Sequence, residues 1–295
     1  MNMSVMIPLA VPNLGRKERE YVNQALDQNW VGPDGPFVRR FEELVAQASG
    51  RKWAVATITG SAAIYAAAWV LDFAGKPVKV PRFAFPAARH VFTKMGCAIS
   101  LVDGGSDHDT MFYRAGDYLA LCDRAPAIGE PPAPAMSFAS LECYSFAANK
   151  TVTCGHGGAV VGDNNDLRYD IRSLIRQGHG LPGRVNYRIA NLNAALGCAQ
   201  MERLDELKEA KRRIWGRYAA TFPMRERGTS RWMATADIQV SPERLAEAGI
   251  EARAEPSGGI SLPCSTGLSE ADQYRVIGAC DTFLRSPAAG PTNAH

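Results

Sequence analysis

The stretch WAVATITGSAAIYAAAWVLDF, residues 53–73, is the part of the sequence that most directly predicts the fold. Its first six residues, 53–58, are apolar or β-branched and indicate a short buried strand. The strand is expected to end at Thr59-Gly60-Ser61, and the small residues that follow predict a helix. A strand that turns directly into a helix is the unit from which helix-covered parallel sheets are built.

The same alternation continues on both sides of this stretch. Residues 29–36, NWVGPDGP, are rich in glycine and proline and predict a loop. The remaining elements of this region are strands predicted at 77–81, 97–103, 117–123 and 157–163, and helices predicted at 15–28, 37–48, 87–96 and 165–177. The pattern therefore predicts an α/β fold with a mostly parallel sheet covered by helices.

The C-terminal part of the sequence has a different pattern. Residues from about 188 to 221 are helical and charged, and residues 222–285 have the short strands and helices of a small α+β unit. We therefore expect a large domain at 1–205, which includes the N-terminal segment, and a small domain at 206–285. Residues 286–295 are small and proline-rich and predict a disordered tail.

Composition and charge exclude several classes of protein. The chain has 295 residues, 46% hydrophobic and 21% charged, and a net charge of +3 without a basic stripe, so we expect no nucleic-acid partner. The seven cysteines are scattered without a C-x-x-C pair, which indicates a reduced, cytoplasmic protein and no metal site. No apolar run approaches about 18 residues and no basic leader is visible, so we expect neither a membrane span nor a signal peptide.

Two groups of residues fall at predicted strand ends, where open parallel sheets bind ligands. Gly60 permits a tight turn, and the amides of Ser61 and Ala62 open a helix, which together would bind an anion. Ordinary packing is the more frequent reason for such a turn. Asp123 directly follows four apolar residues, and a buried carboxylate there needs a cation such as a protonated pyridine nitrogen. A helix cap or surface turn is the alternative.

Two further stretches add possible chemistry. SFAANK, residues 145–150, contains Ser145 and Lys150 among small and apolar residues. Lys150 would either extend to solvent or, if desolvated, attack a carbonyl as a neutral amine. The stretch 186–207, NYRIANLNAALGCAQMERLDEL, begins at Asn186 and has the apolar spacing of a packed helix.

Taken in order, six stretches resemble motifs of the DegT/StrS family of sugar aminotransferases, which depend on pyridoxal phosphate (PLP). The stretches are 7–43, TGSAA (59–63), VPRFAFPA (80–87), LCDRAPAIG (121–129), SFAANKTVTCGHGGAVV (145–161) and 186–207. The resemblance implies the aspartate-aminotransferase fold, fold type I, with the small C-terminal α+β domain.

The resemblance also implies roles for individual residues. Lys150 matches the lysine that holds PLP as a Schiff base, and Asp123 matches the carboxylate that pairs with the pyridine nitrogen. Phe85 matches the aromatic residue that stacks on the ring. Ser61, Ala62 and Ser145 match phosphate ligands at the Gly60 turn. Asn186 matches a residue that reaches the phosphate of the neighbouring subunit, which implies a homodimer with shared active sites. Trp30 and its loop match a segment near the substrate entrance.

The implied reaction moves an amino group from glutamate or glutamine to a keto-sugar, usually nucleotide-linked, in polysaccharide or secondary-metabolite biosynthesis. The lysine at 150 argues against the dehydratases of the family, which carry histidine there. One alternative is a PLP enzyme with another reaction or acceptor, such as a nucleoside, an amino acid or a cyclitol. A non-catalytic relative is the other.

The sequence departs from the family pattern at several places. Pro126 stands where the family usually has Gln or His near the 3-hydroxyl of the cofactor, His156 replaces a Glu, and Asn149 replaces a Thr. Only about fourteen residues separate 103 from 117, where the family has a helix and a further strand, and the C-terminal domain is about half the usual size. We expect the lost strand to make the sheet close up or to leave an edge.

Overall fold

The computed structural model describes residues 6–103, 106–107, 110–115, 119–131, 139–176, 183–226, 229–256 and 258–285. These residues form two compact units. The larger unit holds the described residues of Leu14–Leu207 and residues 229–230, and the smaller unit holds residues 6–13, Lys208–Glu226 and the described residues from Arg231 on. The tail predicted at 286–295 lies outside the described residues.

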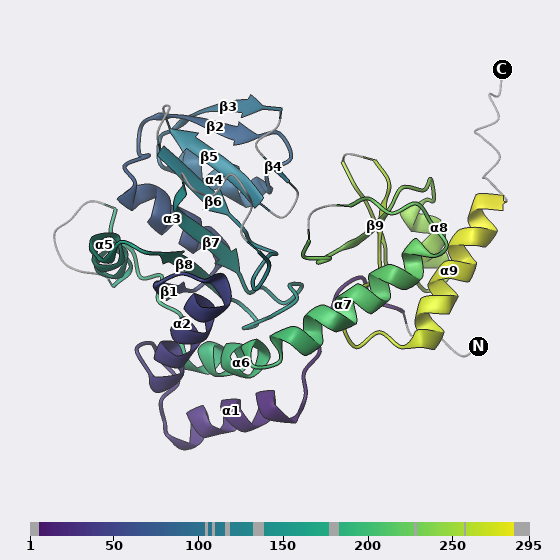
Figure 1. Cartoon of the computed structure of the whole chain (residues 1–295), viewed down its shortest axis with the longest axis horizontal. Helices are drawn as coiled ribbons and strands as arrows, with labels where there is room; N and C mark the ends of the chain where they lie inside the picture. Colours follow the sequence, from purple (N-terminus) through teal and green to yellow (C-terminus); the bar gives the residue numbers. More distant parts are fainter. Residues whose placement is uncertain are drawn as a thin grey trace. The chain divides into compact units, whose positions relative to one another are not determined.

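A seven-strand path forms the sheet of the larger unit, in the order β1-β8-β7-β6-β5-β2-β3. Figure 1 shows these strands one after another across the unit. Their bounds are β1 Trp53–Thr57, β2 Pro77–Pro81, β3 Ala98–Val102, β5 Thr110–Ala115, β6 Leu119–Asp123, β7 Ala139–Ser145 and β8 Gly158–Gly162, and β4, Ser106–Asp107, pairs with β5. Within this path, β5 and β8 run opposite to the other five strands.

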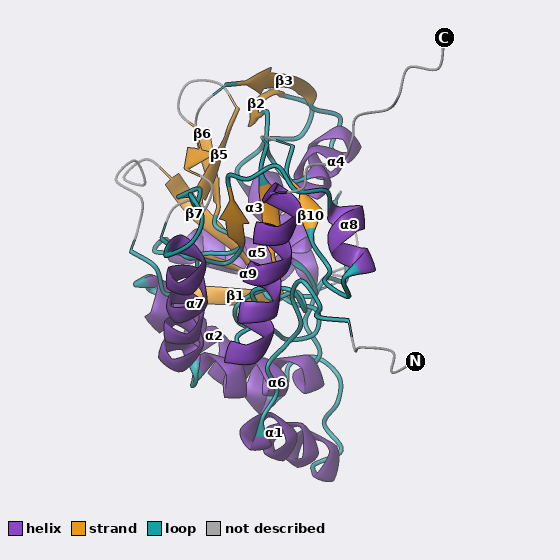
Figure 2. Cartoon of the chain, turned by 90° about the vertical axis from the view of Figure 1, so that its right-hand side faces the viewer, coloured by secondary structure: helices purple, strands orange, loops and turns teal. Residues whose placement is uncertain are grey.

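Helices cover both faces of this sheet, as the sequence predicts; Figure 2 separates the orange strands from the purple helices. The helices of the larger unit are α1 Arg16–Asp27, α2 Pro36–Ser49, α3 Gly60–Val70, α4 Pro86–Lys94, α5 Asn165–Ile175 and α6 Asn191–Met201. Helix α7, Leu204–Ala219, begins in this unit and continues in the smaller one. Residues of β1 alternate between two cores. Trp53 and Val55 pack with α3, α4 and α5, whereas Ala54 and Ala56 pack with α2 and α6. The strand is therefore buried on both sides, which explains its continuous apolar sequence.

The shortened segment between 103 and 117 corrects one expectation. The segment still supplies a strand to the sheet, because β5 lies between β2 and β6 and is antiparallel to both. A parallel strand needs a long crossover, whereas antiparallel strands can be joined by a short turn. Three residues separate β5 from β6. The short segment can therefore supply a strand, but only one that runs in the opposite direction.

The smaller unit combines a three-stranded antiparallel sheet, ordered β10-β11-β9, with helices. Its elements after α7 are β9 Ala234–Ala236, α8 Pro242–Glu247, β10 Arg253–Ala254, β11 Ile260–Leu262 and α9 Glu270–Arg285. Its core includes Tyr218, Leu262 and Val276. Among the helices of the described residues, none has the length and apolar character needed to cross a membrane.

The N-terminal residues pack on the smaller unit, although we expected them in the larger domain. The amide of Ile7 donates to the carbonyl of Gly249 at 2.8 Å, and Cys264 donates to the carbonyl of Leu9 at 2.9 Å. Ile7 is also buried in the core of this unit. An extended segment gains its partners only in the folded chain, so its local sequence did not reveal where it packs.

Candidate active site

The turn from β1 into α3 presents the positive end of a helix. Thr59 is the N-cap residue, and its side-chain oxygen accepts a hydrogen bond from the amide of Ala62 at 3.0 Å. The amides of Gly60 and Ser61 lie in the first turn, where a helix offers no backbone acceptor. The Ala62 amide is therefore occupied by the cap, and the amides of Gly60 and Ser61 are better placed to bind an anion.

Two glycines allow β7 and β8 to approach this turn closely. A Cβ atom on Gly60 would lie 2.8 Å from the Cβ and 3.1 Å from the Oγ of Ser145. A Cβ atom on Gly158 would lie 2.3 Å from the carbonyl oxygen of Thr59. The Ser145 hydroxyl therefore lies beside the first turn of α3, and together they form a small cradle for an anion. The sequence showed Gly158 only as part of a glycine-rich stretch.

Asp123 lies at the carboxyl end of β6, next to β7. It is 7% exposed and pairs in register with Cys143 of β7. Its Oδ1 accepts a hydrogen bond from the amide of Ala125, and its Oδ2 accepts one from the hydroxyl of Tyr113, both at 2.9 Å. The amide of Ser145 donates to the carbonyl of Ala125 at 3.3 Å. The carboxylate and the cradle are therefore neighbours at one edge of the sheet.

The environment of Asp123 suits a cationic partner. Burial raises the pKa of this carboxyl, while the hydrogen bonds from Ala125 and Tyr113 and the positive charge of Lys150 lower it, and burial outweighs them. The ionised form of such a buried carboxyl is stabilised when a second cation approaches it. The effect of Lys150 also shows that its ammonium group lies close enough to Asp123 to influence its charge.

Lys150 follows β7 in a short turn. Its amide donates to the carbonyl of Ala147 at 3.0 Å, and its side chain is half-buried. Cys154 donates to the carbonyl of Phe146 at 2.9 Å and closes the loop that carries the lysine. The loop therefore holds Lys150 at the same edge of the sheet as Asp123 and Ser145.

Phe85 and Asn186 are the two remaining cofactor-binding residues that the motifs imply. Phe85 caps α4 after the carboxyl end of β2 and is 70% exposed, so its ring is available for stacking. Asn186 is exposed in a segment that continues the edge beyond β1, where the Ile58 amide donates to the carbonyl of Tyr187 at 2.8 Å. The oxygen of its side chain accepts from Arg188 at 3.3 Å. Within the described residues, no hydrogen bond joins the side chain of Asn186 to the cradle of its own chain.

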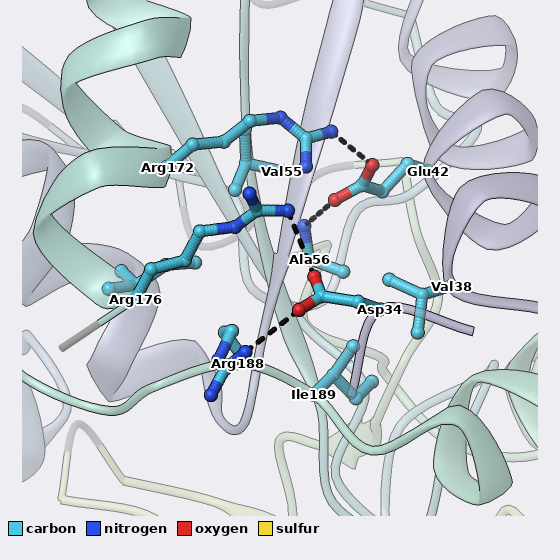
Figure 3. Close-up of a pocket in the computed structure, with 10 residues that line it drawn as sticks. Asp34, Val38, Glu42, Val55, Ala56, Arg172, Arg176, Arg188 and Ile189 are labelled. Carbon is cyan, nitrogen blue, oxygen red and sulfur yellow. Dashed lines mark hydrogen bonds and ion pairs between the residues drawn. The ribbon is translucent and has the colours of Figure 1, made fainter. Parts of the chain in front are cut away.

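A separate small pocket, drawn in Figure 3, is closed by paired charges. Asp34 accepts from Arg176 at 2.9 Å and from Arg188 at 2.8 Å, and Glu42 pairs with Arg172. Its volume of about 10 Å³ would hold no more than one water molecule. The contacts of Asp34 anchor the 29–36 loop, whereas the Glu42–Arg172 pair joins α2 to α5, and the pocket is too small for a ligand.

Asn191 also supports that loop, and the sequence did not single it out. This side chain is fully buried, donates to the carbonyl of Trp30 at 2.7 Å and accepts from the amide of Phe37 at 2.9 Å. A Cβ atom on Gly35 would lie 2.2 Å from it. The available signal was an asparagine at the start of an otherwise apolar helix.

The grouped residues fit the cofactor implied by the motifs. The cradle offers amides and a hydroxyl to a phosphate, Asp123 offers an anion to a ring nitrogen, and Lys150 offers an amine to an aldehyde. Gly60 and Gly158 leave no room for a Cβ atom, so the first turn of α3 packs directly against the ends of β7 and β8.

Comparison with known proteins gives matches along most of the chain. The sequence profile of the DegT/DnrJ/EryC1/StrS aminotransferase family matches residues 12–112 and 121–241. GDP-perosamine synthase from Caulobacter vibrioides is 28% identical, over 94% of this chain and 98% of that relative. GDP-perosamine synthase from Vibrio cholerae is 30% identical, over 71% of this chain and 69% of its own length. The crystal structure of DesI in the presence of its TDP-sugar product has a TM-score of 0.80 at 22% identity and covers 97% of this chain and 94% of that one, which shows the fold.

The comparison also shows where the chain is shortened. The alignment with the Caulobacter protein covers 98% of that relative and extends over 366 positions. This is more than the 295 residues of this chain, so the alignment contains gaps in this chain. Internal segments of the relative therefore have no counterpart here. The two stretches matched by the family profile are separated by residues 113–120, within the segment that forms β5 and the start of β6.

Proposed function

The chain belongs to the DegT/DnrJ/EryC1/StrS aminotransferase family, and we propose that it transfers an amino group from glutamate or glutamine to a nucleotide-linked keto-sugar. It is a PLP-dependent aminotransferase of the α/β fold type I, a sugar aminotransferase of shortened length. The observation that supports the specific site is the grouping of Asp123, Ser145 and the first turn of α3, with Lys150 close enough to lower the pKa of Asp123.

The residues of the chain divide the work of binding and proton transfer. When bound, PLP supplies an electron sink that stabilises negative charge on the reacting substrate carbon. The amine of Lys150 would hold the cofactor through its aldehyde and, once displaced, carry a proton to and from the substrate. Asp123 would keep a proton on the ring nitrogen. The amides of Gly60 and Ser61 and the hydroxyl of Ser145 would bind the phosphate, and Phe85 would stack on the ring.

An absorbance and trapping experiment tests this proposal. The purified protein with PLP should show the visible absorbance band of a lysine-bound cofactor, and this band should shift when L-glutamate is added. Borohydride should fix the cofactor on Lys150, detectable by peptide mass, and Lys150→Ala should abolish both signals. Lys94→Ala, at an exposed lysine of α4, is the matched control.

The outcomes separate the remaining alternatives. Amine transfer to a GDP- or TDP-linked keto-sugar supports the proposed acceptor. A cofactor band that does not respond to glutamate favours another PLP reaction or acceptor. A protein that stays colourless with PLP and is not labelled at Lys150 contradicts the proposal and favours the non-catalytic alternative.

We also propose a homodimer in which Asn186 of each subunit completes the phosphate site of the other. Its exposed side chain, which among the described residues makes no hydrogen bond to its own cradle, supports this arrangement. Mixing Lys150→Ala and Asn186→Ala proteins under subunit exchange tests it. If the two subunits share each site, one of the two sites in every mixed dimer is intact, so activity should reappear. If each site lies within one chain, both sites of a mixed dimer are defective and no activity should appear.

We also propose a cytoplasmic location, which the seven unpaired cysteines support.

A further inference from the structure

Tyr113 reaches the candidate site from the shortened segment. β5 pairs with β6 in a register that sets Met111 opposite Asp123 and Tyr113 opposite Leu121. Residues two apart on a strand share a face, so Tyr113 and Asp123 are diagonal neighbours on the same side of the sheet. Their side chains meet, and the Tyr113 hydroxyl donates to Oδ2 of Asp123 at 2.9 Å.

The phenol of Tyr113 is held as a donor. Its side chain is fully buried, and its ring packs edge-on against Phe92 with the ring centroids 5.0 Å apart. Burial and the charge of Asp123 raise the pKa of Tyr113 well above its usual value, so the proton stays on the hydroxyl. A neutral phenol can donate to the carboxylate but adds no charge to the pocket.

We propose that Tyr113 is a positioning residue that orients Asp123 and stabilises its ionised form for contact with the cofactor's ring nitrogen. This inference rests on the proposed function. Oδ1 and Oδ2 each already accept one hydrogen bond, from Ala125 and Tyr113, which fixes the plane of the carboxylate. Tyr113 lies between the two stretches that match the family profile, so the departure from the family pattern supplies this contact.

The groups around Asp123 define what a titration would report. Tyr113 faces it from β5, Lys150 faces it from the turn after β7, and the thiols of Cys143 and Cys122 lie close enough for its charge to raise their pKa values. Among these groups Lys150 is the cation. Loss of the Tyr113 hydrogen bond should therefore raise the pKa of Asp123, because a contact that favours the ionised form is removed.

The first test uses the protein without PLP. Carbon-13 labelling of the aspartates, with Asp123→Asn for assignment, gives the titration of Asp123 by NMR. Tyr113→Phe, which keeps the ring against Phe92, should raise the pKa of Asp123. The matched control is Tyr218→Phe in the smaller unit, where a fully buried tyrosine loses a 2.9 Å hydrogen bond to the carbonyl of Pro263. An Asp123 titration that is unchanged in Tyr113→Phe and equal to the control overturns the inference.

The second test reads the cofactor directly. In protein loaded with PLP labelled with nitrogen-15 in the ring, Tyr113→Phe should move the ring-nitrogen resonance toward the unprotonated position. The value of kcat should fall about tenfold, which is the factor that corresponds to the loss of one hydrogen bond to a charged group. The value of KM should change little, because Tyr113 would not touch the substrate. A ring nitrogen that is as protonated as in the wild type overturns the proposed role.

A reciprocal measurement does not need the Tyr113 variant to fold. Because the charge of Asp123 raises the pKa of Tyr113, Asp123→Asn should lower that pKa, and an unchanged tyrosine titration contradicts the coupling. Failure of the proposed function has a different signature. In that case wild-type Lys150 is not trapped with PLP, while the Asp123 titration still reports on Tyr113.

Discussion

At the scale of single residues, Asp123 combines a structural disadvantage with a proposed role. Burial raises its pKa above the usual value despite its hydrogen-bond donors. A carboxyl whose folded pKa is raised contributes stability below its unfolded pKa and loses that contribution as the pH rises through the folded pKa. The ionised side chain therefore destabilises the protein without PLP at neutral pH, and a cationic ring nitrogen would relieve this effect.

Asp123→Asn is expected to stabilise the PLP-free protein relative to wild type at pH 8, with the difference shrinking toward acid pH. The amide has nearly the same shape, and it can still accept from Ala125 and donate to Tyr113. Urea unfolding at several pH values measures the effect, with the exposed Asp72→Asn as control. A gain that grows toward acid pH would contradict this sign.

Gly158 determines how closely β8 approaches the cradle. Gly158→Ala should lower stability by about 1–3 kcal/mol, because the new methyl group must displace the carbonyl of Thr59. It should also weaken PLP binding, measured by equilibrium dialysis, because the cradle is forced open. Gly216→Ala in α7 has no atom within 4 Å and should instead stabilise by about 0.5–1 kcal/mol. Equal effects at both glycines would argue against the cradle.

At the scale of elements, the turn into α3 depends on its cap. Thr59→Ala removes the acceptor of the Ala62 amide and should cost about 1 kcal/mol of stability in urea unfolding. Thr59→Ser keeps an acceptor and should lose much less. If both variants unfold at the same urea concentration, the side-chain cap contributes nothing measurable.

β5 shows how a short segment can still supply a strand to the sheet. The sequence predicted a loss in this segment, and the number of residues was too small for a helix and a parallel strand. The register of β5 against β6 then placed Tyr113 beside Asp123. Strand pairing is a contact between separate parts of the chain, so this neighbour could not be found from local spacing.

At the scale of the whole molecule, the chain is organised as two units that are not continuous in sequence. Ile7→Ala should destabilise the smaller unit by about 2–5 kcal/mol, because Ile7 is buried in its core. Hydrogen exchange should show faster opening in β9, β11 and α9. Met6→Ala, at a residue that is 47% exposed, is the control. Faster exchange confined to the larger unit would contradict the assignment of this segment.

The sequence alone determined the alternation of strands and helices, the α/β class and the family. Those features depend on local apolar spacing and on ordered motifs around Gly60, Asp123 and Lys150. Only the tertiary structure decided that β5 is antiparallel, that Gly158 borders the cradle, that Asn191 holds the Trp30 loop and that Tyr113 donates to Asp123. Each of these contacts joins residues from different elements, and its free energy exists only after the elements have packed.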